Sequence, residues 1–241
     1  MSLFTKRIRR AFRRYGIVGV LTFTAERAAS AIARMRSSVR KEIRERRERA
    51  AAFDSTYGVD TIGRIHQVEL GVKSPNQLHA VAYGASDPKY FRDAIRSLPI
   101  DYGRFVFIDF GSGKGRALIL ASEFQFKRVV GVEFSEILHR TALKNIEKYR
   151  NHTSRADIIE SICIDASLYQ LPDDPLVCYF LNPFDQILMS QVLSNIQESL
   201  FRNKREIFIV YYNPRQGHLF DQDPGFLRIG TIGPVRIWRT N

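Results

Sequence analysis

Glycine occupies alternate positions in the segment Asp109-Phe110-Gly111-Ser112-Gly113-Lys114-Gly115. Glycine has no Cβ atom, so the backbone there can adopt positive φ angles and come close to a ligand. The apolar run over 105–109 predicts a strand before the glycines, and a helix is predicted after them over 114–124. Free N–H groups at a helix start suit a polar or anionic ligand. The segment therefore indicates a nucleotide-type site, although a simple tight turn between strand and helix would also use glycine.

Two other glycine motifs do not fit this segment. A phosphate-binding P-loop needs Gly-x4-Gly-Lys followed by Ser or Thr. Here Gly113-Lys114 is followed by Gly115, and the position five residues before Gly113 is Ile108. The dinucleotide-binding fingerprint needs a third glycine three residues after the second, and that position is Arg116. Both motifs are therefore excluded.

The remaining pattern, Asp-x-Gly-Ser-Gly-x-Gly, resembles the first motif of class I S-adenosylmethionine-dependent methyltransferases. Glu133, at the tip of a predicted strand over 128–133, matches the acid that holds the ribose hydroxyls, and a carboxylate can accept two such hydrogen bonds. Asp165, which ends a predicted strand over 161–165, matches the residue that receives the adenine amino group. The resemblance implies that S-adenosylmethionine, and its product S-adenosylhomocysteine, bind at Asp109, Gly111, Ser112, Gly113, Gly115, Glu133, Phe134, Asp165, Ala166 and Asn182.

Asn182-Pro183-Phe184 directly follows a predicted strand over 176–181. The segment resembles a shortened form of the Asn/Asp-Pro-Pro-Tyr/Phe motif of N-methyltransferases, with one proline instead of two. In that family carbonyl oxygens accept hydrogen bonds from the target nitrogen, while the aromatic ring packs on the substrate. Positioning of this kind is the main catalytic contribution to a displacement reaction. The alternative is an Asn-Pro turn that only opens the next helix.

Tyr83 lies upstream of the glycine-rich segment, in Tyr83-Gly84-Ala85-Ser86-Asp87-Pro88. Non-SET protein lysine methyltransferases place a tyrosine-containing segment at the corresponding point, and the chain is most similar to them. The resemblance makes Tyr83 a candidate catalytic residue beside Asn182, Pro183 and Phe184. The alternative is that Tyr83 is a packing residue.

From residue 104 onward, predicted strands alternate with predicted helices, which is typical of a parallel sheet. Further strands are expected over 206–212, 226–229 and 235–238, and helices over 136–149 and 185–201. The last two strands resemble the antiparallel sixth and seventh strands of the methyltransferase family. We expect an α/β fold, a Rossmann-like seven-stranded methyltransferase sheet with helices on both faces, preceded by a basic helical N-terminal arm.

Three regions are predicted along the chain. Residues 1–50 form the basic helical arm, in which one helix is predicted near the start and a second over 23–49. Residues 51–103 form a connecting or lid segment that includes the first helix of the body, from Pro88 to about Ser97. Residues 104–241 form the S-adenosylmethionine-binding domain.

The positive charge of the chain is concentrated in the arm. Residues 1–50 contain 15 Lys or Arg and four acidic residues, whereas the rest of the chain contains 22 and 21. An apolar stripe recurs there at helical spacing between arginines, which predicts a basic amphipathic helix: Phe4, Ile8, Phe12 and Tyr15. Such an arm favours an anionic membrane surface or nucleic acid as a partner. A solvated helix without a partner is the alternative.

Cysteine and histidine usage argues against disulfides and metal sites. Cys163 and Cys178 both lie in apolar runs and are expected to be buried thiols in a reducing compartment. No histidine pair has metal-ligand spacing, so we expect no metal. The apolar stretch over 17–23 is too short to span a bilayer. We expect a cytoplasmic protein, with the arm as a possible route to a peripheral membrane position.

These patterns together predict an S-adenosylmethionine-dependent methyltransferase that acts on a nitrogen of a protein side chain, with lysine favoured. RNA or small-molecule methylation is the alternative within the same enzyme class. A non-catalytic module that keeps the cofactor fold and is tethered by its basic arm is the alternative outside it. The sequence leaves the oligomeric state open.

Overall fold

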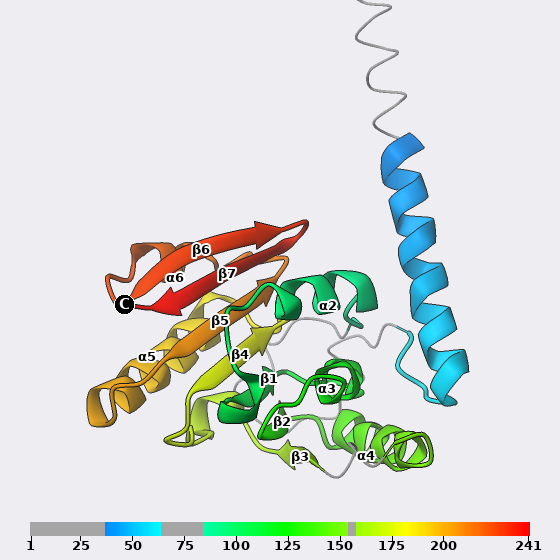
Figure 1. Ribbon diagram of the computed structural model, residues 1–241, viewed down its shortest axis with the longest axis horizontal. Helices are drawn as coiled ribbons and strands as arrows, with labels where there is room; N and C mark the ends of the chain where they lie inside the picture. Colours follow the sequence, from blue (N-terminus) through cyan, green and yellow to red (C-terminus); the bar gives the residue numbers. More distant parts are fainter. Residues whose placement is uncertain (1–36, 64–83, 154–157) are drawn as a thin grey trace, which may run out of the picture. The chain divides into compact units, whose positions relative to one another are not determined.

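The computed structural model describes residues 37–63, 84–153 and 158–241 (Figure 1). The amphipathic stripe predicted at the start of the arm lies outside these residues, as does Tyr83. The chain divides into two compact units, Met1–Glu48 and Arg49–Asn241. In the first unit, residues 37–48 are helical. Across the described part of the chain, no helix is long and apolar enough to cross a membrane.

Seven strands of the second unit form one sheet in the order β3-β2-β1-β4-β5-β7-β6 (Figure 1). Their bounds are β1 Val106–Phe110, β2 Arg128–Glu133, β3 Ile159–Cys163, β4 Leu176–Phe180, β5 Ile207–Tyr212, β6 Phe226–Ile232 and β7 Val235–Thr240. The first five strands are parallel, and β7 lies antiparallel between β5 and β6. The predicted Rossmann-like seven-stranded fold is confirmed.

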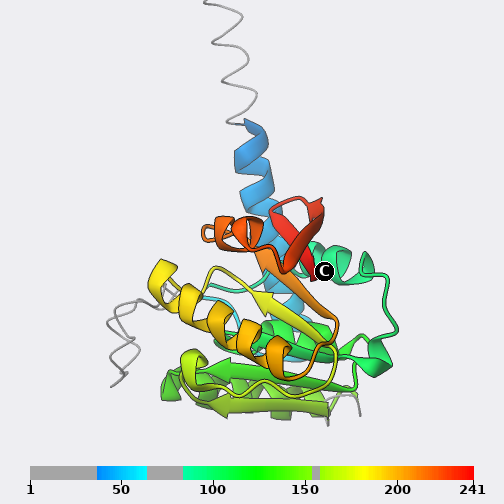
Figure 2. The ribbon, with the colours of Figure 1, turned by 90° about the vertical axis from the view of Figure 1, so that its left-hand side faces the viewer.

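Helices cover both faces of the sheet (Figure 2). One face packs against α2 Pro88–Arg96, α3 Arg116–Ser122 and α4 Glu136–Arg150, and the other against α5 Gln186–Arg202 and α6 His218–Gln222. Every residue of β1, β4 and β5 is buried. Strands covered on both faces need apolar side chains at every position, which explains why these runs do not alternate with polar residues.

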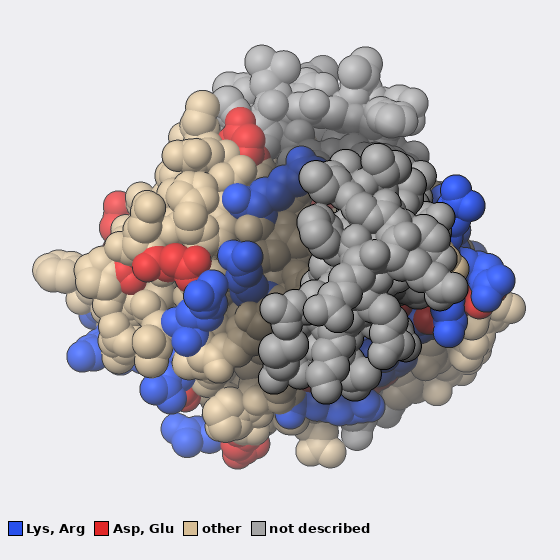
Figure 3. Space-filling view, turned by 90° about the horizontal axis from the view of Figure 1, so that it is seen from above, with Lys and Arg blue, Asp and Glu red and all other residues tan. Residues whose placement is uncertain are grey.

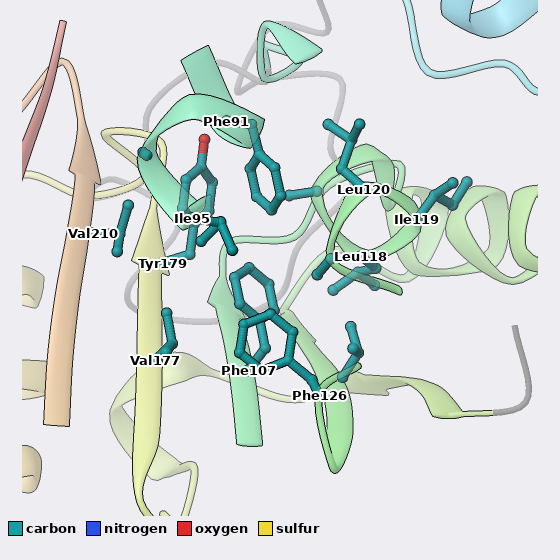
Figure 4. Close-up of a cluster of buried hydrophobic side chains, with 14 of the residues drawn as sticks. Phe91, Ile95, Phe107, Leu118, Ile119, Leu120, Phe126, Val177, Tyr179 and Val210 are labelled. Atoms are coloured by element: carbon teal, nitrogen blue, oxygen red, sulfur yellow. The ribbon is translucent and has the colours of Figure 1, made fainter. Parts of the chain in front are cut away.

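The core under α2 and α3 is rich in aromatic rings (Figure 4). Phe91 of α2 lies 5.8 Å from Phe107 of β1 and 5.1 Å from Tyr179 of β4, measured between ring centroids. Both pairs meet edge to face, the arrangement that the charge distribution of aromatic rings favours. This packing fixes α2 above the sheet, and with it the segment that enters α2.

Side-chain caps fix the points where the helices begin. Asp87 caps α2 and is followed by Pro88, whose missing N–H costs nothing at the first helical position. Ser135 caps α4 and Asp185 caps α5. Helices α4 and α5 therefore begin shortly after the carboxyl ends of β2 and β4. Polar residues in these short connections are held at one edge of the sheet.

The structure departs from the sequence-based expectations at four places. The helix predicted to end at residue 49 continues through residue 57, because Phe53 and Tyr57, four residues apart, pack on each other and on the body. The third strand ends two residues before Asp165. Helix α6 was not predicted. Cys178 is buried, whereas Cys163 is exposed because it ends the edge strand β3.

Candidate active site

The glycine-rich turn leaves β1 and immediately returns toward β2. The backbone N–H groups of Gly111 and Ser112 both donate to the carbonyl oxygen of Val132, at 2.8 and 3.1 Å. Gly111, Gly113 and Gly115 all have positive φ, and Gly115 is the last residue before α3. The alternating glycines thus supply the conformations that other residues rarely adopt, and the turn is held against the end of β2.

Glu133 joins the tip of β2 to this turn. One carboxylate oxygen accepts the N–H of Gly113 at 2.8 Å, and the other accepts the N–H of Ser135 at 2.9 Å. Burial raises the pKa of Glu133 to about 7, and the hydrogen bonds from backbone N–H groups oppose this rise. A carboxylate has about four acceptor positions, so the observed bonds leave room for hydroxyl donors from a ligand.

Asp109 and Ser112 provide two further buried polar groups at the turn. Burial, and then the charge of Glu133, raise the pKa of the Asp109 carboxyl well above its usual value. The hydroxyl oxygen of Ser112 is buried and, within the described residues, has no hydrogen-bond partner. This hydroxyl lies over Gly131 of β2, where an added Cβ atom would be 2.7 Å from it, so the glycine leaves room for the Ser112 side chain.

A small hollow of about 10 Å³, room for roughly one water molecule, opens beside these groups. It is lined by Gly84, Ala85, Ser86, Asp109, Gly111, Ser112, Arg116, Ala117 and Leu181. Pockets that enclose whole ligands usually measure about 300–1,000 Å³, so this hollow alone encloses no ligand, and a ligand would lie along the turn. Glu133 lies on the β2 side of the turn and would meet such a ligand. The free acceptor positions of Glu133 fit the ribose hydroxyls of S-adenosylmethionine, and the positive-φ turn lets such a ligand approach its backbone.

Phe134, Asp165 and Ala166, the residues predicted for the adenine side, lie next to Glu133. The N–H of Ile164 donates to the carbonyl of Glu133 at 3.0 Å, which brings the residues after β3 beside the tip of β2. Asp165 caps a short 3-10 helix, Ala166–Leu168, and its Oδ1 accepts the N–H and hydroxyl of Ser167 at 2.9 and 2.7 Å. One oxygen of Asp165 is therefore engaged locally, and its contact with adenine stays a prediction.

Asn182 is held beyond the end of β4 in an unusual backbone conformation. Its φ is +45°, and within the described chain only Asn213 shares a positive φ among residues other than glycine. The side-chain Oδ1 accepts a hydrogen bond from the hydroxyl of Tyr211 at 3.3 Å, and the residue is buried. Non-glycine residues in such conformations cluster at functional sites. This geometry supports the candidate role of Asn182, although the simple-turn reading uses the same residues.

The two residues after Asn182 are part of the packing. Pro183 lies against Gly111, where an added Cβ atom would be 2.6 Å from the Cβ of the proline. Phe184 is buried in the core between the sheet and α5. Its ring thus stabilises the start of α5, and the predicted contact between Phe184 and a substrate stays a prediction.

The segment upstream of α2 does reach the site. Ser86 lines the hollow, its hydroxyl lies 2.9 Å from that of Tyr179, and its carbonyl accepts a hydrogen bond from Arg116 at 3.3 Å. Gly84 and Ala85 also line the hollow. Tyr83 precedes these residues but lies outside the described residues, so its predicted role stays a prediction.

Arg116, the residue that excluded the dinucleotide fingerprint, is the centre of a buried network that the sequence did not reveal. Its guanidinium donates to Asp54 at 3.0 Å and to the hydroxyl of Thr61 at 2.6 Å, and it lies over the ring of Phe53. Asp54 also accepts the backbone N–H groups of Thr61 and Ile62. Residues 53–62 are thereby fixed to the start of α3, directly behind the glycine-rich turn.

Lys114 and Asn145 fix the same segment to the turn itself. The ammonium of Lys114 donates to Asp60 and to the carbonyl of Ile62, both at 2.9 Å. The buried Asn145 amide donates to the carbonyls of Asp60 and Lys114 and accepts the N–H of Asp60. The only sequence signal was a pair of polar residues, Lys114 and Arg116, at the start of an otherwise apolar helix.

Comparison with solved structures gives matches at low sequence identity and with TM-scores below 0.5. No protein-family model and no curated protein matches the chain. A SAM-dependent methyltransferase from Geobacter sulfurreducens in complex with S-adenosyl-L-homocysteine is 20% identical, with a TM-score of 0.43. The match covers 60% of this chain and 66% of the other, so this chain spans slightly less than two thirds of that protein's length. An RNA methyltransferase from Salinibacter ruber, also in complex with S-adenosyl-L-homocysteine, is 20% identical, with a TM-score of 0.40, over 66% and 92%.

A protein of the NADB-Rossmann superfamily from Streptococcus agalactiae is 14% identical, with a TM-score of 0.47, and the match covers 66% of this chain and 69% of the other.

Within the described residues, no group of three or more His, Cys, Asp or Glu side chains is arranged to hold a metal ion. The strand order, with antiparallel β7 inserted between β5 and β6, gives this chain the fold of the class I S-adenosylmethionine-dependent methyltransferases.

Proposed function

We propose that this protein transfers the methyl group of S-adenosylmethionine to a nitrogen atom, with a lysine side chain of a protein as the favoured acceptor. One observation carries the proposal. Asn182, a buried amide in a strained conformation, is held by Pro183 directly against the glycine-rich turn at Gly111. A carbonyl acceptor and a cofactor turn are thus joined at one edge of the sheet, where ligands of open α/β sheets bind.

The residues of the chain have separate tasks in this reaction. When bound, the cofactor supplies an electrophilic methyl group on a sulfonium centre. Glu133 accepts ribose hydroxyls, and the positive charge of the bound cofactor would favour the ionised form of Asp109, which burial disfavours. Asn182 Oδ1 accepts an N–H of the acceptor and so aims the nitrogen lone pair. An amide takes up no proton at neutral pH, so the acceptor loses its proton to water.

The lysine preference rests on the resemblance of the segment from Tyr83 to Pro88 and of the motif at Asn182 to known N-methyltransferases. A different observation favours RNA as the second candidate acceptor. Arg215 is exposed just beyond the end of β5, and its charge acts on the hydroxyl of Tyr211, which contacts Asn182. Figure 3 shows several Lys and Arg side chains on this face of the molecule. Such positive charge suits a phosphate-bearing acceptor.

Binding of the cofactor is tested first. Calorimetry with S-adenosylhomocysteine in the presence of EDTA should show binding by the wild-type protein. The variant Gly113→Arg should bind none, because its side chain fills the turn and its φ of +56° is strained for arginine. If the wild-type protein binds neither S-adenosylhomocysteine nor S-adenosylmethionine, the proposed function is wrong.

Transfer is tested with tritium-labelled S-adenosylmethionine and a cell lysate separated into protein, RNA, lipid and small-molecule fractions. Label in protein that hydrolysis recovers as methyllysine supports the favoured acceptor. Label in RNA supports the second candidate. Cofactor binding without label in any fraction would instead identify a non-catalytic module that retains the fold.

A further inference from the structure

Tyr211 is a fully buried residue of β5 whose hydroxyl reaches the candidate acceptor residue. Its ring packs among Phe180 and Phe220 on the α5 face of the sheet. The hydroxyl lies 3.3 Å from Asn182 Oδ1, and both residues are buried. The β4–β5 register pairs Tyr211 with Phe180, two residues before Asn182. The strand that neighbours the acceptor turn thus supplies a polar contact to that turn.

The direction of this hydrogen bond follows from the chemistry of its two atoms. Burial raises the pKa of the Tyr211 phenol to about 12, and the nearby backbone N–H of Gln216 opposes this rise. The phenol therefore keeps its proton throughout the neutral range. Since an amide oxygen can only accept, the protonated phenol of Tyr211 donates to Asn182 Oδ1.

Such a bond selects one orientation of the Asn182 amide. Rotation about the terminal torsion of asparagine is broad and roughly two-fold, so the amide has little preference of its own. The backbone of Asn182 is already fixed, because Pro183 packs on Gly111. The side chain is then fixed by Tyr211, which occupies one of the two acceptor positions of Oδ1 and leaves the second for another donor.

We propose that Tyr211 is a positioning residue for methyl transfer, which holds the carbonyl of Asn182 in the orientation that receives the acceptor nitrogen. The inference rests on the proposed function of Asn182, and it assigns Tyr211 no contact with cofactor or acceptor. Removal of the hydroxyl lets the amide turn about its terminal torsion, so that its NH2 group competes for the position of the carbonyl. An NH2 group cannot accept a hydrogen bond from the acceptor nitrogen.

The variant Tyr211→Phe removes the hydroxyl and keeps the ring. Its initial rate of tritium transfer, measured on the lysate fraction that the wild-type protein labels, should fall about tenfold or more. The Kd for S-adenosylhomocysteine should stay within about twofold of the wild-type value. Tyr149→Phe is the matched control, because it also removes a buried phenol hydroxyl, one that contacts Ser122 near the carboxyl ends of α3 and α4. This control should keep the wild-type rate.

Nuclear magnetic resonance provides a second measurement that does not depend on turnover. The side-chain NH2 resonances of Asn182, assigned by their loss in Asn182→Ala, should shift or broaden in Tyr211→Phe and stay unchanged in Tyr149→Phe. A wild-type rate in Tyr211→Phe, or unchanged Asn182 resonances, overturns the proposal. A fall in rate matched by an equal loss of S-adenosylhomocysteine affinity also overturns it, because the hydroxyl would then support only the fold. If the wild-type protein labels no fraction, the proposed function itself fails.

Discussion

A Cβ atom on Gly111 would lie 2.6 Å from the Cβ atom of Pro183. The turn after β1 and the turn after β4 are therefore in direct contact, with no room for a side chain between them. The φ of Gly111 is also positive, at +78°. The residue that shapes the candidate cofactor turn thus also sets the position of the residue next to Asn182, so a change in one turn must move the other.

Gly111→Ala should destabilise the protein and weaken cofactor binding together. Positive φ costs alanine about 1–2 kcal/mol, and overpacking against Pro183 adds about 1–3 kcal/mol. Urea unfolding and calorimetry with S-adenosylhomocysteine measure the two effects. Gly58→Ala is the control, because Gly58 has a φ of +63° but nothing within 4 Å of an added Cβ. Equal losses of stability in the two variants would mean that the contact with Pro183 relaxes freely.

Cofactor affinity should rise with pH through about 7. Burial raises the folded-state pKa of Glu133 from 4.5 to about 7, so the cofactor-free protein favours the protonated carboxyl. The stability that this shift contributes is fully present below pH 4.5 and is lost as pH rises through 7. Ribose hydroxyls donate to the ionised carboxylate, so binding favours the form that burial disfavours. Below pH 7 the affinity should fall by about tenfold for each pH unit.

Calorimetric titrations with S-adenosylhomocysteine between pH 5.5 and 8.5 test this dependence. Glu133→Gln is the control, since an amide of similar shape does not titrate. It should bind more weakly than the wild-type protein at pH 8.5 and show a much flatter profile. Some slope will remain, because the pKa of Asp109 is also raised by burial and by the charge of Glu133. A wild-type profile that is flat across pH 7 would contradict the assignment of Glu133 to the ribose hydroxyls.

Two substitutions of Asn182 separate its amide from its backbone conformation. Asn182→Gly tolerates a positive φ and removes the amide, whereas Asn182→Ala removes the amide and strains the backbone. Both variants should lose turnover by about 100-fold, as for groups that position a reacting atom. Asn182→Gly should lose turnover much more than it loses affinity for S-adenosylhomocysteine. If Asn182→Gly transfers label at the wild-type rate, the segment is only a turn that opens α5.

Asp54→Ala should be among the most destabilising single substitutions in the body. It removes the carboxylate that pairs with Arg116, whose side chain is 2% exposed. Breaking a buried ion pair from one side costs about 3–5 kcal/mol, and Asp54 also accepts two backbone N–H groups. Asp93→Ala provides the comparison, because its i,i+4 pair with Lys89 is exposed and screened by solvent, so its loss should change stability far less. Urea denaturation measures both differences.

The sheet and its ligand-facing edge were predictable because they depend on local patterns. Continuous apolar runs mark strands buried on both faces, and the glycines between β1 and α3 mark the turn. The acid at the tip of β2 and the asparagine after β4 then follow from strand order alone. Each of these features is read within a few residues of sequence, so the predictions did not require knowledge of long-range contacts.

The network around Arg116 could not be predicted, because it joins residues that are distant in sequence. Asp54 and Arg116 are 62 positions apart, and Asp60 and Asn145 are 85 apart. No periodic pattern links such pairs. The same limit explains why the sequence predicted an end at residue 49 for the helix that contains Phe53. The last turns of this helix are stabilised by packing on the body, which no local pattern shows. It also explains Cys163, whose exposure depends on β3 being the edge strand.

The structure moves the boundary at which the basic arm can be removed. Arg49 belongs to the second compact unit and pairs with Asp87 at 2.6 Å, where the Asp87 side chain is fully buried. The carbonyl of Ala50 accepts a hydrogen bond from Arg116 at 3.5 Å. A truncation through residue 50, the predicted end of the arm, would therefore leave Asp87 without its partner. Removal of residues 1–48 keeps both contacts.

The protein without residues 1–48 should bind S-adenosylhomocysteine with wild-type affinity and lose its affinity for an anionic partner. The first 50 residues carry nearly all of the net charge, and their apolar stripe favours an anionic membrane surface over nucleic acid. Sedimentation with liposomes, with and without anionic lipid, is compared with an RNA shift assay over a salt series, in which binding to phosphates weakens steeply as salt rises. Loss of liposome binding alone supports the membrane, and loss of the RNA shift alone supports nucleic acid. If the full-length and shortened proteins behave equally in both assays, the arm has neither partner.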